Sequence, residues 1–144
     1  MTYVEALQTT LAAEHAAVYV YGALGAQTSQ SANPRLYADL AAAYTDHRAG
    51  RDQLIRTLRD EEADPVPAEP AYALPPDLST PDLVMRRALR LERGCAATFA
   101  YLVANSPPQA RKWAVNALTK TAVRELAFRG TPEIFPGSDE YADR

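Results

Sequence analysis

The chain repeats one polar pattern at a fixed distance, and this repeat constrains the fold more than any other feature of the sequence. Glu14 and His47 are separated by 33 residues, and Glu92 and Glu125 are separated by the same interval. Shifting the first half of the chain by 78 residues superimposes the two pairs. The same shift aligns Leu11 with Leu89, Tyr21 with Phe99, Leu24 with Leu102, Leu40 with Leu118 and Arg51 with Arg129. The repeat predicts a duplicated helical hairpin with a polar residue near the middle of each helix.

Apolar residues recur at steps of three and four in four segments, which predicts four helices. Prolines stand at the expected first positions of the last three helices, where their fixed backbone angle suits a helix start. The expected helices span residues 3–27, 34–62, 81 to the turn at 105–108, and 108–128. In the fourth helix the inward stripe is predicted to be Val115, Leu118, Ala122 and Glu125.

Residues 63–79 contain five prolines and therefore form an extended connector between the two hairpins. At about 3.1 Å per residue the connector can reach roughly 50 Å, which exceeds the length of the helices beside it. This length lets the second and third helices run parallel. We therefore predict an all-α fold, a four-helix bundle in which residues 1–144 form a single domain. In the tail, residues 130–144, we expect Ile134 and Phe135 to pack on one end of the bundle.

Composition limits the classes of function. A net charge of −3 and a pI of about 5.4 argue against a nucleic-acid-binding protein. The sequence has no basic and apolar leader and no apolar run near 18 residues, so we expect no membrane segment and a cytoplasmic location. Cys95 has no second cysteine to pair with, and its place in an apolar stripe predicts a small core residue.

Four polar residues stand where the helical pattern calls for apolar ones: Glu14, His47, Glu92 and Glu125. Burying an ionised carboxylate alone is very costly, so each needs a partner charge or a proton. A metal ion is one solution. Carboxylate oxygens with one imidazole suit iron, manganese or zinc.

The chain resembles the ferritin-like domain superfamily, and most closely a bacterial ferritin-like family of unknown function. The resemblance rests on residues 11–17 (LAAEHAA), 69–72 (EPAY) and 135–137 (FPG), together with the two hairpins and the long crossover. It implies a ferritin-like four-helix bundle. In that superfamily, two helices each supply one glutamate and the other two each supply a Glu-x-x-His pair to a di-iron centre.

The sequence departs from that ligand pattern on two helices. Glu14 and Glu92 match the lone glutamates, and His47 is kept, but Tyr44 stands where the paired glutamate belongs. On the fourth helix Ala122 replaces the glutamate and Glu125 replaces the histidine. Six ligands are thereby reduced to four. The resemblance therefore implies a degenerate centre that holds at most one metal and lacks di-iron chemistry.

Arginines offer an alternative to a metal. Arg51 follows His47 by four residues, and Arg129 follows Glu125 by four, which places each one turn further along the same helix face. Arg48 and Arg124 are also close in sequence. The four polar residues are therefore interpreted as an ion-paired network, as ligands of one metal, or as separate solvated groups.

We expect a non-catalytic binding or assembly module without a cofactor. The sequence leaves catalysis open but favours a protein that is not an enzyme. The alternative is a metal-binding redox or metal-storage protein that retains one iron, manganese or zinc site. Tyr3, Tyr37, Tyr101 and Trp113 give more aromatic surface than a small core needs, which favours a homodimer.

Overall fold

The computed structural model describes residues 2–128 and 134–138, and its described part consists of four helices joined by loops. The helices are α1 (Tyr3–Ala26), α2 (Pro34–Asp60), α3 (Pro81–Asn105) and α4 (Pro108–Ala127). The all-α prediction is confirmed, and the expected bounds agree with the observed ones to within a few residues. None of the helices in the described ranges is long and apolar enough to cross a membrane.

The helix starts follow from local sequence. The side chain of Thr2 accepts a hydrogen bond from the amide of Glu5, whose carboxylate accepts one from the amide of Thr2. Thr80 caps α3 in a similar way through the amide of Leu83, ahead of the proline at the first helical position. Asn33, the expected cap of α2, makes no capping side-chain bond, so that helix start relies on Pro34.

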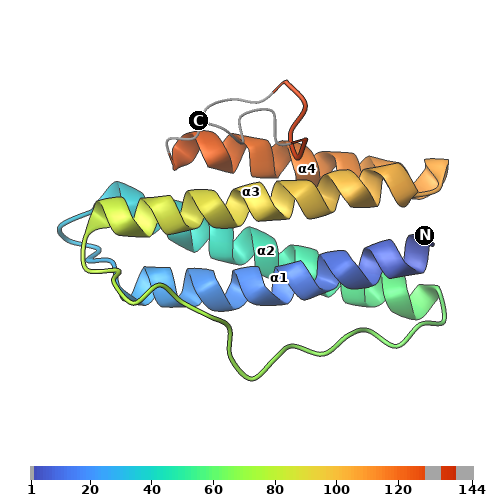
Figure 1. Cartoon of the computed structure of the whole chain (residues 1–144), viewed down its shortest axis with the longest axis horizontal. Coiled ribbons are helices and arrows are strands. Elements are labelled where there is room, and N and C mark those ends of the chain that lie inside the picture. Colours follow the sequence, from blue (N-terminus) through green and yellow to red (C-terminus); the bar gives the residue numbers. More distant parts are fainter. Residues whose placement is uncertain (1, 129–133, 139–144) are drawn as a thin grey trace.

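The four helices form a bundle in which α1 packs against α2 and α3, and α3 packs against α4. Figure 1 shows α2 and α3 running in the same direction, with the extended connector passing along the bundle from one end to the other. The structure thus contains the parallel pair that the long connector predicts. By contrast, α2 and α4 contact each other only lightly.

The connector is fastened to one face of α1. The Gln8 side chain donates to the carbonyl of Asp64 at 2.7 Å and accepts from the amide of Val66 at 2.8 Å. A ring nitrogen of His15 lies 2.9 Å from the carbonyl oxygen of Val66. Gln8 and His15 thus hold the start of the connector against α1.

The core lies along the inner faces of all four helices, but the inward face of α4 differs from the prediction. Ala114, Thr121 and Glu125 are buried there, followed by Phe128 just after the helix. Val115 is 43% exposed. Glu125 is buried as predicted, and Leu118 packs partly buried against the core. Ala114 and Thr121, however, take the inward places expected for Val115 and Ala122. The reason is that Val123 and Leu126 make the outer face of α4 apolar too, so periodicity alone does not identify the inner face.

The expectation that Ile134 and Phe135 pack on a bundle end is wrong, since these side chains are 77% and 69% exposed. The tail approaches the bundle through Gly137 instead. Its φ of +86° suits glycine, and a Cβ there would lie 2.5 Å from the carbonyl oxygen of Ala96 on α3. The rest of the tail, 130–133 and 139–144, lies outside the described residues.

Candidate functional site

All four polar residues singled out by the repeat are buried in the bundle. Glu14 on α1, His47 on α2, Glu92 on α3 and Glu125 on α4 are each at most 3% exposed. Direct contacts join the first three of them. Glu125 is buried on α4 next in the chain to Arg124, which belongs to the same cluster.

His47 is the centre of the cluster because it bonds to a carboxylate on each side. Its Nδ1 lies 2.8 Å from Oε1 of Glu14, and its Nε2 lies 2.7 Å from Oε1 of Glu92. Ionised carboxylates only accept hydrogen bonds, so both ring nitrogens donate and the ring is an imidazolium. Burial by itself lowers the pKa of His47, but the bonds and charges of the two glutamates outweigh it and raise that pKa to about 9.

A single oxygen of Glu92 collects three donors. Besides His47, the Tyr21 hydroxyl donates to Oε1 at 2.6 Å and the Arg124 Nε–H donates to it at 2.9 Å. Burial raises the pKa of Glu92, but these donors and the two positive charges lower it overall. Oε2 of Glu92 is buried without a hydrogen-bond partner among the described residues. The carboxylate is therefore held ionised through one oxygen.

Tyr21 serves the cluster as well as the core. Its ring stacks on the imidazole of His47 with centroids 5.4 Å apart, and on Phe128 at 6.1 Å. Burial and the neighbouring charge of Glu92 raise the pKa of the Tyr21 hydroxyl well above its ordinary value, so this group remains a donor. A tyrosine on an inward helix face is compatible with aromatic packing and with a hydroxyl contact to the polar centre, and Tyr21 makes both.

Arg124 connects the buried cluster to the surface. Its Nη1 lies 3.1 Å from Oδ2 of Asp46, and its Nη2 donates to the Thr121 hydroxyl at 3.0 Å. Its side chain is 13% exposed, whereas that of Glu92 is fully buried. The charges of Glu14 and Glu92 are thus matched by those of two cations, His47 and Arg124. Arg124 also pairs with Asp46, and the buried Glu125 is its neighbour in the chain.

Arg51 does not take the place that helix periodicity predicted for it. Its guanidinium bonds to the neighbouring carboxylate of Asp52, with Nη2 2.8 Å from Oδ1. Both side chains of this pair are partly exposed, so the pair forms without the free-energy cost of desolvating the Arg51 guanidinium. Arg129, the second arginine expected to pair with the glutamates, lies outside the described residues.

Cys95 brings a third kind of metal donor to the cluster. Three possible metal-donor atoms, one from each of Glu14, His47 and Cys95, lie within 4.8 Å of one another. Burial and the charges of the two glutamates raise the pKa of the Cys95 thiol well above its ordinary value, which disfavours the thiolate that a metal would need. The sequence interpretation of Cys95 as a core residue agrees with its 2% exposure but missed its neighbours.

Gly50 gives Glu14 the room it occupies. A Cβ at position 50 would lie 2.6 Å from Oε2 of Glu14, so any larger residue would push the carboxylate aside. The sequence contained a signal for the Asp46–Arg124 pair. Asp46 and Arg124 are 78 residues apart and so occupy equivalent positions in the two hairpins, one with each sign of charge.

Comparison with known proteins agrees with this architecture and assigns no activity to it. The crystal structure of a conserved hypothetical protein, rv2844, from Mycobacterium tuberculosis is similar, with 30% sequence identity and a TM-score of 0.78. The match covers 87% of this chain and 86% of that one. No curated protein gives a significant match. A family model matches residues 6–140. The chain therefore belongs to the family described as domain of unknown function (DUF4439).

Proposed function

We propose that this protein is a ferritin-like bundle that has replaced a metal centre with a charge-balanced network of protons and arginine, and that it acts as a non-catalytic binding or assembly module. The observation that carries the proposal is the position of His47. Its two ring nitrogens are both directed at carboxylates, so the imidazolium lies where a cation between Glu14 and Glu92 would lie.

The donor set does not fit the di-iron centre that the ferritin-like resemblance implies. Such a centre needs carboxylates that bridge two ions, and Tyr44 and Ala122 stand at the positions of those glutamates. In addition, Arg124 brings a positive charge to 2.9 Å from Glu92, which opposes the approach of a metal cation. We therefore assign no redox step to this cluster.

One retained metal site is the alternative function, and the grouping of Glu14, His47 and Cys95 favours it. To bind a metal, His47 would have to lose a proton and Cys95 would have to ionise. Both pKa shifts oppose these changes, since the pKa values of the imidazolium and the thiol are raised. A protonated His47 between Glu14 and Glu92 is therefore better supported than a bound metal ion.

Elemental analysis distinguishes the two functions. The protein is expressed in medium supplemented with iron, manganese and zinc, and its metal content is compared with that of Glu14→Ala and Glu92→Ala variants. We expect well below one equivalent of each metal in the parent, and lower stability in both variants because each leaves a cation without its partner. One or more equivalents of a metal in the parent, lost in both variants, would establish the metal site instead.

The assembly part of the proposal is supported by the outer face of α4. Val123 is 61% exposed and Leu126 is 50% exposed, and both lie on the side of α4 that faces away from the core. The aromatic residues Tyr3, Tyr101 and Trp113 pack partly against the core, so they leave less free surface than the sequence suggested. We expect a homodimer by light scattering and a monomer after Val123→Lys and Leu126→Lys are combined. A parent that remains monomeric at high concentration would contradict this part.

A further inference from the structure

A groove runs between α2 and α4, the two neighbouring helices that contact each other only lightly. It consists of two hollows of about 440 and 540 Å³, which adjoin at Gln53, Trp113 and Asn116. Each volume lies within the range of roughly 300–1,000 Å³ that is typical of small-molecule sites. The groove therefore has the dimensions of a ligand site.

Small residues on the facing helices create this groove. Ala49 on α2 and Ala117 on α4 line the larger hollow, and Ala110 and Ala114 on α4 line the smaller one. Side chains of this size leave the space between two helices unfilled. The groove is thus a consequence of residue choice along both helices.

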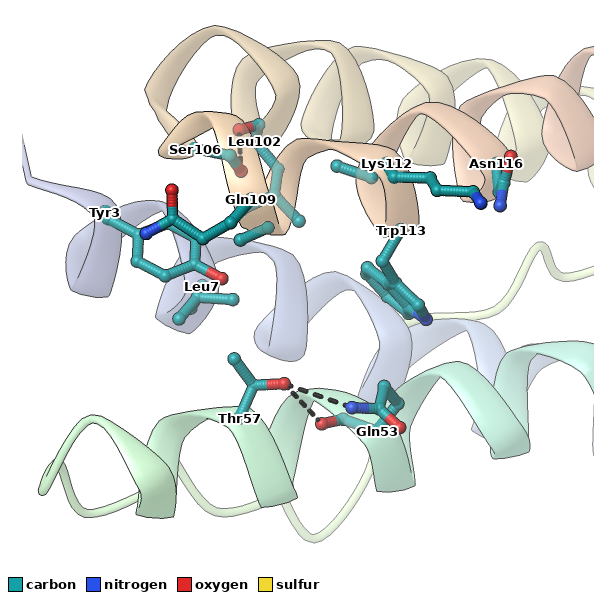
Figure 2. A pocket seen from close by; sticks show the side chains of 12 residues that line it. Tyr3, Leu7, Gln53, Thr57, Leu102, Ser106, Gln109, Lys112, Trp113 and Asn116 are labelled. Carbon is teal, nitrogen blue, oxygen red and sulfur yellow. Dashed lines mark hydrogen bonds between the residues drawn. The ribbon is translucent and has the colours of Figure 1, made fainter.

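The inner surface of the groove is largely apolar. Leu7 and Leu102 line the smaller hollow, and the indole of Trp113 meets the ring of Phe99 edge-on at 6.1 Å in the larger one. Figure 2 shows Trp113 pointing from α4 toward Gln53 on α2 in the smaller hollow, and both residues also line the larger one. An apolar molecular body can therefore lie along the groove in contact with these side chains.

The walls of the groove are cationic, although the chain carries a net charge of −3. Lys112 and Lys120, the two lysines of the sequence, both line it, as does Arg56. Within residues 2–128 and 134–138, these three cations form no ion pair; Arg56 donates instead to the neutral Gln53 amide at 2.8 Å. Three cations beside an apolar surface are available to an anionic ligand.

The two carboxylates that also line the groove do not cancel this charge. Glu14 bonds to His47, and Asp46 bonds to Arg124 at 3.1 Å, a cation that it shares with the buried Glu92. These three carboxylates and two cations carry one net negative charge, against the three positive charges of Arg56, Lys112 and Lys120. The positive charge of the walls is therefore in excess over the unpaired negative charge.

We propose that the groove binds a small organic anion with an extended apolar body, in the chemical class of a medium-chain carboxylate. The carboxylate pairs with Arg56 and Lys120 in the larger hollow, and the chain passes Trp113 to lie on Leu7 and Leu102. This proposal rests on the binding role proposed above and supplies the ligand class for it.

Intrinsic fluorescence can report binding in the groove, because Trp113 is the only tryptophan of the sequence and lines the groove. Decanoate is titrated into the full-length protein while Trp113 fluorescence is recorded, and calorimetry confirms the stoichiometry. Decanol, which has the same chain without the charge, and acetate, which has the charge without the chain, serve as matched probes. We expect saturable binding of one decanoate, about tenfold weaker binding of decanol and none of acetate.

Two double variants separate recognition from general charge. Arg56→Gln with Lys120→Gln removes two groove cations, and we expect it to weaken decanoate binding by about tenfold. Arg59→Gln with Arg86→Gln removes the same charge from exposed positions that do not line the groove, and we expect less than about a twofold change. Circular dichroism melting curves of both double variants check that each remains folded.

Three results would overturn the proposal: no saturable binding of decanoate, equal affinity for decanol, or equal weakening in the two double variants. These results are independent of the metal analysis. A metal-loaded parent that binds decanoate would refute the charge-balanced centre and leave the groove as the binding site. A metal-free parent that binds no decanoate would refute the groove alone.

Discussion

The two hairpins place buried polar residues at equivalent positions, yet they neutralise their glutamates with different cations. In the α1–α2 hairpin, His47 lies 33 residues after Glu14 and bonds to it at 2.8 Å. In the α3–α4 hairpin the equivalent position is Glu125, and Arg124, one residue earlier, bonds to Glu92. Repeated spacing thus determines where the buried charges stand, while a longer side chain at a neighbouring position can supply the counter-charge.

The two cations also differ in their surroundings. His47 is 1% exposed and bonds only to carboxylates of the bundle interior, whereas the side chain of Arg124 is 13% exposed and also bonds to the half-exposed Asp46. If His47 is removed, the carboxylates of Glu14 and Glu92 remain buried without access to water. If Arg124 is removed, water can reach Glu92 from the surface. The hairpins should therefore respond unequally to loss of their cations.

The largest expected effect is that of His47→Gln. A neutral amide cannot balance Glu14 and Glu92 together, so we expect the free energy of unfolding to fall by about 3–5 kcal/mol. Urea unfolding of the parent and the variant measures it. As a control, Arg51→Gln in the surface pair with Asp52 should change stability by less than about 0.5 kcal/mol. Equal losses in the two variants would contradict the role given to His47.

The pH dependence of stability should reveal the same histidine. Its pKa is about 9 in the folded protein and about 6.5 in the unfolded chain, so its stabilisation is complete below pH 6.5 and is lost as the pH rises through 9. At about 1.4 kcal/mol per pKa unit, the loss is about 3 kcal/mol. Unfolding measured between pH 6 and 10 should show this decline in the parent and a flatter profile in His47→Gln. Identical profiles would refute the imidazolium assignment.

Arg124→Gln should cost less than loss of His47. Glu92 keeps the bonds from His47 and Tyr21, and water can reach the vacated side, so we expect a loss of about 2 kcal/mol. Urea unfolding compares the two variants directly. A larger loss for Arg124→Gln than for His47→Gln would reverse the comparison between the hairpins.

The smallest effect is expected at Gly50, whose equivalent in the second hairpin is the buried Phe128. Gly50→Ala adds up to about 1 kcal/mol of helix propensity but pushes Oε2 of Glu14 away from its present position. We expect a net loss of about 1 kcal/mol in the parent and a net gain in the Glu14→Ala background. Stabilisation in both backgrounds would show that Glu14 moves without weakening its bond to His47.

Several features could be predicted from the sequence because they depend on local rules. The four helices follow from periodicity and from prolines at helix starts, and the parallel α2 and α3 follow from the length of the proline-rich connector. The burial of Glu14, His47 and Glu92 follows from their places in apolar stripes. On α4 periodicity identified the buried Glu125 but not Ala114 and Thr121, because apolar residues such as Val123 and Leu126 also occupy the outer face.

Only the tertiary structure decided which charges meet. Arg51 and Arg124 are both long, flexible side chains near the cluster in sequence, and helix spacing favoured Arg51. In the fold Arg51 pairs with Asp52 at the surface. Arg124 pairs instead with Glu92 on α3 and Asp46 on α2. The sequence determines the face on which a residue lies because helix geometry is local. The partner of a long side chain depends on the distance to other helices and on access to water, which packing alone sets.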